Sequence, residues 1–143
     1  MNYNEIAREL LAVQAAFLHL PIGISLSEIS EGEYFALRLL SEKDPPSSPS
    51  EISKTMKVST ARVSALFRHL EEKGFIRKEH SDKDERAILI SLTEKGREFI
   101  SEKTAAAEEK LSDILKKMGA EDAAEYARLR KKILMIARKK ETM

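Results

Sequence analysis

The sequence predicts a mainly helical protein that carries one small β-hairpin. Apolar residues recur at helical spacings of three and four along most of the 143 residues. Two short runs break this pattern, FIRKEH at 75–80 and RAILISL at 86–92, and the second is β-branched and apolar, as strands are. With 42% hydrophobic and 34% charged residues, a chain of this length is expected to form a single domain, 1–143, with its own core.

Composition excludes several kinds of chemistry. The chain has no cysteine, so disulfides, thiolate metal sites and thiol catalysis are ruled out. The most apolar run, residues 10–20, is eleven residues long and contains Gln14 and His19, so it is too short and too polar to span a bilayer. Because no basic segment precedes this run, it does not resemble a secretory signal. We expect a cytoplasmic protein without membrane contact, in which this run is a buried amphipathic helix.

The N-terminal third is predicted to contain two helices and a loop. The first helix is marked by an apolar stripe, which consists of Ile6, Leu10, Val13 and Phe17. Pro21 and Gly23 are predicted to end it. A capping box, SEGE at 30–33, predicts the start of a second helix. The apolar residues of that helix are Tyr34, Leu37 and Leu40. The serine- and proline-rich segment 41–50 predicts a loop.

A pair of helices is predicted after the loop. The sequence SPSE at 48–51 is a second capping box, with Pro49 at the first helical position, where its missing N–H costs nothing. Ser59 is the predicted N-cap of the next helix, which covers 60–73 and ends at Gly74. A short helix, a tight turn and a longer helix, followed by a hairpin, predict a winged helix-turn-helix.

Two more helices follow the hairpin. Thr93 is predicted to cap a long helix over 94–118, and Gly119 is predicted to end it. A last helix covers roughly 121–140. Its apolar stripe consists of Tyr126, Leu129, Ile133 and Ile136.

The helix predicted at 60–73 has two different faces. Its core face consists of Val63, Leu66, Phe67 and Leu70. The remaining surface and the N-cap carry small and basic residues, namely Ser59, Thr60, Ala61, Arg62, Ser64, Ala65 and Arg68. Small side chains let a helix enter a groove of DNA, alanine can contact a thymine methyl, and arginine can bind guanine with two hydrogen bonds. Residues 52–70 hold four lysines and arginines and no acidic residue. This face is interpreted as a DNA-binding surface or, alternatively, as a protein contact with a chance charge pattern.

Three segments match a known pattern. ISEGEYFALRLL at 29–40 is similar to Leu-Thr-x-x-Gln-x-x-x-Leu-x-x-Leu, with Ile29, Ser30 and Glu33 as departures. LEEKGFI closes the helix-turn-helix, and DERAILISLTEKG matches Asp-x-Arg-x-x-x-x-x-Leu-Thr-x-x-Gly at every fixed position. Over about residues 29–100 the chain thereby resembles the MarR-type winged-helix transcriptional regulators.

The resemblance implies a homodimer on DNA. In the family, N- and C-terminal helices interlock between subunits, here residues 1–28 and 120–143, and the 94–118 helix connects them to the winged helix-turn-helix. Two recognition helices then enter successive major grooves of an imperfect palindrome. Residues 1–33 carry five glutamates and residues 127–140 carry seven basic and no acidic residues. These ends either pair across the dimer or are separately solvated helix faces.

The resemblance also implies roles for residues of the wing. Arg86 would enter the minor groove, and Asp84 would hold its guanidinium, since aspartate and arginine make a planar pair of hydrogen bonds. Lys83 is a further candidate for DNA contact. The alternative is a solvated turn whose charges are unrelated to DNA.

The expected function is a ligand-responsive repressor. Family members bind small aromatic or phenolic effectors, and His19, Tyr34 and Arg38 are candidates for such a site, although ordinary core contacts explain them equally well. The three histidines lack metal-ligand spacing, so no metal or other cofactor is expected. The sequence has no glycine-rich phosphate loop and no plausible catalytic triad, so an enzyme is the weakest candidate and none is expected. The alternative from another class is a winged-helix adaptor that binds protein and has no specific DNA binding.

Overall fold

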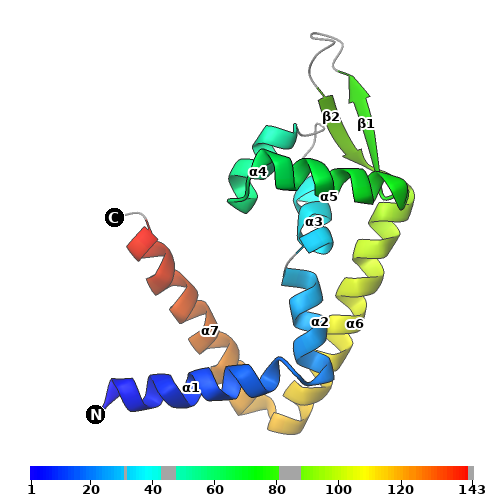
Figure 1. Ribbon diagram of the computed structural model, residues 1–143. Helices are drawn as coiled ribbons and strands as arrows, with labels where there is room; N and C mark the ends of the chain where they lie inside the picture. Colours follow the sequence, from blue (N-terminus) through cyan, green and yellow to red (C-terminus); the bar gives the residue numbers. More distant parts are fainter. Residues whose placement is uncertain (31, 43–47, 81–87, 142–143) are drawn as a thin grey trace. The chain divides into compact units, whose positions relative to one another are not determined.

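The structure, a computed structural model, describes residues 1–30, 32–42, 48–80 and 88–141 (Figure 1). The chain folds as two compact units, Met1–Ala107 and Glu108–Met143. In chain order the elements are α1 (Tyr3–Phe17), α2 (Pro21–Ser30), α3 (Gly32–Glu42), α4 (Pro49–Met56), α5 (Thr60–Glu72), β1 (Ile76–His80), β2 (Ile88–Leu92), α6 (Glu94–Met118) and α7 (Ala120–Glu141). This order confirms the predicted fold class, mainly helical with a two-stranded wing.

The core of the first unit lies where α4 and α5 pack against α3 and the hairpin. Its largest fully buried side chains are Leu37, Ile52, Val63, Phe67, Leu70, Ile76 and Ile90. They come from three helices and both strands, and each of these elements contributes one apolar face. Burying a side chain of this size contributes roughly 1.5–3 kcal/mol. Phe67 and Leu70 therefore fix α5 with its opposite face outward.

Serine side chains start both helices of the helix-turn-helix, as predicted. The Ser48 hydroxyl accepts the amide of Glu51 at 3.3 Å, and Pro49 is the first residue of α4. The Ser59 hydroxyl accepts the amide of Arg62 at 3.2 Å. Caps of this kind contribute about 1 kcal/mol each, because they satisfy amides that the helix leaves open.

The C-terminal end of α5 is closed by Gly74, also as predicted. Gly74 has a φ of +80°, which a glycine adopts without steric cost. The amides of Gly74 and Phe75 donate to the carbonyls of Glu71 and Leu70 at 2.9 and 3.0 Å. This pair of hydrogen bonds is a Schellman motif, and it turns the chain from α5 directly into β1.

Thr93 joins the base of the hairpin to α6. Its amide donates to the Phe75 carbonyl at 3.1 Å, and its hydroxyl donates to the Gly74 carbonyl at 2.6 Å. The same hydroxyl oxygen accepts the Gly96 amide at 3.1 Å, which confirms Thr93 as the cap of α6. At Gly96 a Cβ atom would lie 2.2 Å from the Phe75 carbonyl oxygen, so this position has no room for a side chain.

The two strands form the predicted hairpin. β1 and β2 are antiparallel, with Ile76 opposite Leu92 and His80 opposite Ile88. Ile76, Ile90 and Leu92 are buried and attach the base of the hairpin to the core. Residues 81–87, which connect the strands, lie outside the described residues.

The prediction for the segment after the first helix is wrong in part. Pro21 and Gly23 mark a break, but α1 already ends at Phe17, and Pro21 begins a further helix, α2, that the sequence pattern did not predict. Proline is tolerated in the first turn of a helix because its missing N–H has no partner there. A Cβ at Gly23 would lie 1.9 Å from the Phe17 carbonyl oxygen, so glycine permits the close turn between α1 and α2.

The prediction that residues 10–20 are buried is wrong for the single chain. No residue of α1 is buried, and Leu10 and Val13 are 62% and 63% exposed, because the apolar stripe of this helix lies outside the core. Among the described helices none is by itself long and apolar enough to cross a membrane. The pair α1 and Pro21–Ile29, bent by 92°, meets that criterion by length and composition alone.

The second unit consists of the later part of α6 and of α7. α6 ends at Met118, before Gly119 with a φ of +96°, as predicted. No residue of α7 is buried, and its apolar stripe, Tyr126, Leu129, Ile133 and Ile136, is 42–57% exposed. The Arg128 guanidinium donates to both carboxylate oxygens of Glu125, at 2.6 and 2.8 Å. These hydrogen bonds hold the pKa of the Glu125 carboxyl below its ordinary value.

Candidate nucleic-acid interface

The turn between α4 and α5 sets the direction of the longer helix. Lys57 adopts the left-handed conformation with a φ of +57°, and the Ser53 hydroxyl donates to the Val58 carbonyl at 2.7 Å across the turn. A left-handed residue other than glycine costs roughly 1–2 kcal/mol. Burial of Ile52 before the turn and Val63 after it offsets this cost. The sequence gives no signal for the conformation of Lys57.

The outward face of α5 carries the residues predicted for it. The exposed candidates are Thr60, Ala61, Arg62, Ser64, Ala65 and Arg68. Five of them share one face, and Arg62 lies at its flank, because residues spaced by three and four lie together on a helix. Ser59 is exposed as well, and its hydroxyl is engaged as the N-cap of α5. The structure therefore brings all seven helix candidates to one surface at and beyond the N-terminus of α5.

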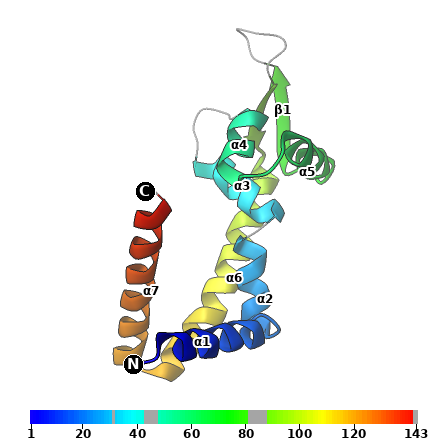
Figure 2. The same ribbon diagram turned by 60° about the vertical axis from the view of Figure 1, so that its left-hand side comes forward.

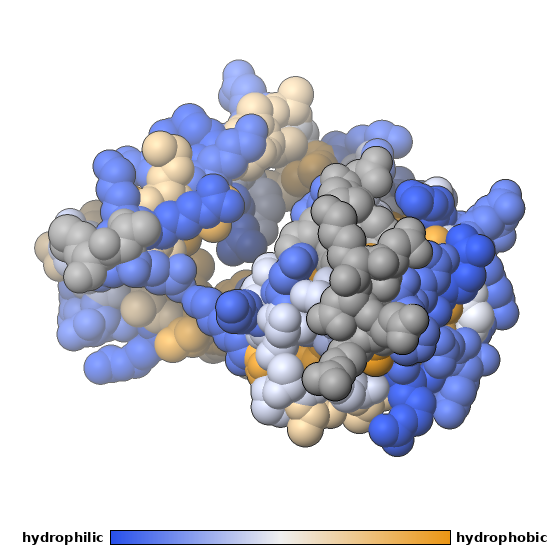
Figure 3. Space-filling model, turned by 90° about the horizontal axis from the view of Figure 1, so that it is seen from above, coloured by the Kyte–Doolittle hydropathy of each residue, from blue (hydrophilic) through white to orange (hydrophobic). Residues whose placement is uncertain are grey.

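Positive charge surrounds this surface. Lys54 and Lys57 are exposed on α4 and at its end, and Arg62 and Arg68 are exposed on α5. Acidic side chains are absent from 52–70 and return only at 71–72, in the last turn of α5. Figure 3 views the wing from above, and hydrophilic and near-neutral residues dominate the surface around it. A basic surface of this kind attracts phosphate groups over several ångströms.

The wing candidates Lys83, Asp84 and Arg86 lie outside the described residues. Their roles therefore stay predictions. The neighbouring strand β1 is exposed from Arg77 to His80, and within it Lys78 Nζ lies 3.8 Å from a carboxylate oxygen of Glu71 on α5.

A hollow of about 310 Å³ lies among four helices of the first unit. Its lining residues are Glu28, Glu33, Tyr34, Lys73, Phe99 and Lys103. α2 runs beside α6 in both ribbon views (Figures 1 and 2), and Lys103 Nζ of α6 lies 3.3 Å from a carboxylate oxygen of Glu28 on α2. The Tyr34 hydroxyl is 2.6 Å from the Thr104 hydroxyl. The hollow thus combines two aromatic rings with two lysine–glutamate pairs.

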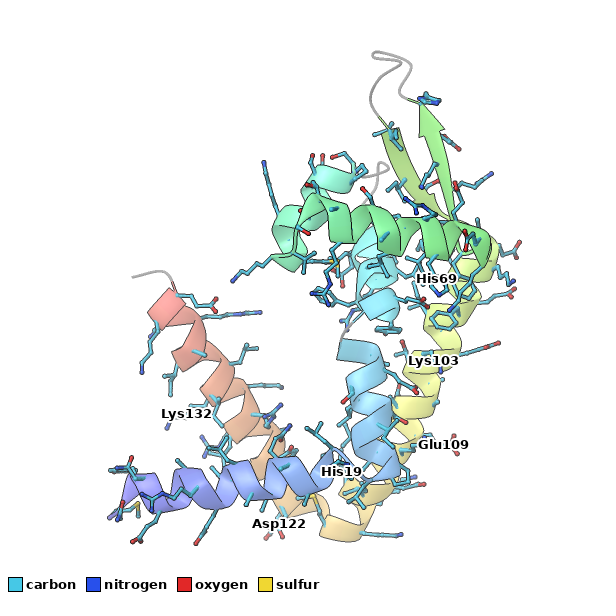
Figure 4. The ribbon with its side chains drawn as sticks, in the orientation of Figure 1. His19, His69, Lys103, Glu109, Asp122 and Lys132 are labelled. Atoms are coloured by element: carbon cyan, nitrogen blue, oxygen red, sulfur yellow. The ribbon has the colours of Figure 1, made fainter. Side chains whose placement is uncertain are left out.

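Of the three candidates for effector binding, Tyr34 lines this hollow and the other two do not. Arg38 forms an exposed ion pair with Glu42 at 3.2 Å, and His19 lies in the turn between α1 and α2 (Figure 4). Phe99 and Lys103 are not predicted from the sequence. Phe99 has the spacing of an apolar helix residue, and only the packing of α6 brings it beside Tyr34.

A family model described as "Transcriptional regulator SarA/Rot" matches residues 25–103, which is more than half of the chain. The chain belongs to the MarR/SarA family of transcriptional regulators. The matched segment runs from α2 into α6 and includes the complete helix-turn-helix and hairpin. This membership confirms the resemblance to MarR-type regulators and agrees with the expectation that the protein is not an enzyme.

The curated relatives of this MarR/SarA protein have low sequence identity to it. The transcriptional repressor MprA of Escherichia coli K12 is 36% identical over 75 residues, which cover 52% of this chain and 43% of MprA. The chain spans less than two thirds of the length of the curated relatives it matches.

Solved structures share the fold over almost the whole chain. A MarR family protein from Bacillus stearothermophilus has a TM-score of 0.75 at 22% identity and covers 96% of this chain and 99% of its own. FabT of Streptococcus pneumoniae, solved in complex with DNA, has a TM-score of 0.68 at 20% identity with the same coverage. At these identities the likeness establishes the fold of this family member.

Proposed function

We propose that this MarR/SarA protein is a cytoplasmic transcriptional repressor that binds double-stranded DNA through the outward face of α5. The observation that carries the proposal is this face, where Arg68 stands among Ala61, Ser64 and Ala65 and no acidic residue lies within 52–70. A helix with such small side chains fits the major groove closely, and a good arginine–guanine pair contributes about 1–3 kcal/mol of discrimination. The DNA-bound relative FabT and the repressor MprA support the proposal.

The proposed active form is a homodimer. The apolar stripes of α1 and α7 are exposed in the single chain, and a second copy with the same stripes is a partner that buries them. A two-fold dimer presents one α5 per subunit, so its operator would be palindromic, with half-sites about 10 bp apart, one helical turn. The acid-free run at 127–140 and the glutamates near the N-terminus fit an electrostatic contribution to this assembly.

The proposed DNA contact includes the wing. On the resemblance, Arg86 enters the minor groove, Asp84 orients its guanidinium, and Lys83 adds a phosphate contact. An arginine in the minor groove favours A·T-rich sequence, where the groove is narrow and its potential most negative.

The proposed effector is a small aromatic or phenolic acid that occupies the hollow at Tyr34. Its ring would lie against Tyr34 and Phe99, and its carboxylate would replace a glutamate at Lys103. With benzoate and 4-hydroxybenzoate as probes, we expect DNA affinity to fall several-fold in the parent protein. Lys103→Met should abolish this response, and Lys116→Met, which removes an exposed lysine of α6 that does not line the hollow, should keep it. An unchanged response in Lys103→Met would remove the hollow as the effector site.

The experiment that tests the function is a salt titration of DNA binding. Four basic residues on or beside each α5 predict phosphate contacts in a dimer, so affinity should fall by about 10³-fold or more between 50 and 200 mM salt. Arg68→Ala should relax base preference near the centre of each half-site. Arg86→Ala should instead reduce the preference for A·T at the outer edges. Binding that is weak and insensitive to salt would favour the protein-interaction adaptor.

A further inference from the structure

One carboxylate on α3 binds two side chains of α5. Glu33 Oε1 lies 2.8 Å from His69 Nε2, and Glu33 Oε2 lies 2.9 Å from Lys73 Nζ, which is also 3.1 Å from Oε1. Only a quarter of the Glu33 side chain is exposed, whereas about half of His69 and of Lys73 is exposed. The carboxylate is therefore the sheltered centre of the cluster, and Figure 4 places His69 at the end of α5 nearest α6.

His69 and Lys73 mark the C-terminal end of α5. His69 lies in the last turn, and Lys73 is the C-cap. The Lys73 carbonyl also accepts a hydrogen bond from Lys95 Nζ of α6 at 2.9 Å. This end of α5 is thus held by α3 through Glu33 and by α6 through Lys95, while the outward face from Thr60 to Arg68 is the proposed DNA face.

A carboxylate at position 33 is a departure of this chain. The MarR pattern to which residues 29–40 are similar has glutamine there. A glutamine side chain has one acceptor oxygen and an NH₂ group, so it cannot accept from His69 and Lys73 through two oxygens as this carboxylate does. The sequence alone marks Glu33 as part of a capping box and as a departure from this pattern. It does not identify the partners of Glu33, because His69 and Lys73 lie about forty residues further along the chain.

We propose that Glu33 is a positioning residue for DNA recognition, which holds the end of α5 so that its outward face meets the groove in one orientation. This inference rests on the proposed function. Loss of the carboxylate frees two long or polar side chains and the helix end that carries them. Ordering such groups again at each binding event costs affinity.

Glu33→Gln tests this role, and Glu42→Gln is the matched control. Glu42 lies on the same helix, α3, and pairs with Arg38 at 3.2 Å, and it does not line the hollow. Each variant removes one negative charge from a protein that binds a polyanion, so electrostatics alone predicts equal or tighter binding for both. We expect Glu33→Gln to bind an operator roughly 3- to 10-fold more weakly at fixed salt, and Glu42→Gln to bind as well as the parent or better.

The ratio of operator affinity to non-specific affinity gives a second measurement, which general destabilisation would not reproduce. An α5 that meets the groove in several orientations loses contacts to bases but keeps its attraction to phosphate groups, so we expect this ratio to fall in Glu33→Gln. General destabilisation would instead lower both affinities together. Glu42→Gln should keep the ratio of the parent.

The outcomes distinguish the two proposals. If the parent protein binds no DNA specifically, the proposed function fails and the role of Glu33 fails with it. If the parent binds and Glu33→Gln has equal affinity and the same ratio of operator affinity to non-specific affinity, only the role of Glu33 fails. If Glu33→Gln unfolds more easily than the parent, operator affinity is also measured for Lys73→Gln and for the double variant. The loss of affinity in the double variant must then be smaller than the sum of the losses in the two single variants.

Discussion

Leu10→Asp is expected to convert the protein into a folded monomer that no longer binds its operator specifically. Leu10 is 62% exposed in the single chain, so an aspartate there meets water and costs the monomer little. In the proposed dimer the same position is covered twice, once in each subunit. Burying an unpaired carboxylate costs several kcal/mol, so two of them exceed what most dimer interfaces tolerate.

Light scattering and circular dichroism measure the two parts of this expectation. Mass should fall to that of one chain, and helix content should stay close to that of the parent. Ala15→Asp is the control, because Ala15 is exposed on the opposite side of α1 from the apolar stripe. A Leu10→Asp protein that remains dimeric would mean that the α1 stripe has another use.

Gly96→Ala is expected to lower the free energy of unfolding by at least ~2 kcal/mol, the scale of an overpacked core. The added methyl carbon would lie 2.2 Å from the Phe75 carbonyl oxygen, which is backbone and already accepts the Thr93 amide. Relief of this contact requires α6 to move away from the base of the hairpin. Because Thr93 ties both elements together, the shift would break its hydrogen bonds to Gly74 and Gly96.

Denaturant unfolding of Gly96→Ala and Gly119→Ala separates crowding from backbone conformation. At Gly119 nothing lies within 4 Å of an added Cβ, and its φ of +96° is the source of any cost. We expect the free energy of unfolding to fall less in Gly119→Ala, by about 1 kcal/mol, which is typical of a left-handed residue other than glycine. Equal losses in the two variants would contradict the contact at Gly96.

Local chemistry explains which parts of the fold were predictable. Ser48, Ser59 and Thr93 cap helices, and Gly74 ends one, because each acts on backbone groups within a few residues. α2 was missed because proline and glycine at its start are also the residues that end helices. The exposure of α1 was missed because an apolar stripe indicates that a helix is covered by something, without indicating whether the same chain does so.

The candidate site also contains features that the local sequence predicts and features that depend on packing. The outward face of α5 follows from helical spacing, so it was predicted residue by residue. The hollow at Tyr34 and the partners of Glu33 depend on how α2, α3, α5 and α6 pack. No spacing in a single sequence encodes such contacts between distant segments.

The separation of the two faces of α5 has a consequence for how such a protein changes its target. Val63, Phe67 and Leu70 hold the fold, whereas Ala61, Ser64 and their exposed neighbours contribute little to it. Substitutions at exposed positions usually alter stability by no more than about 0.5 kcal/mol. A gene copy can therefore accumulate changes on the outward face one at a time, and each intermediate remains folded. On the proposed function, changes at a few surface positions would be enough to recognise a new operator, without redesign of the scaffold that presents them.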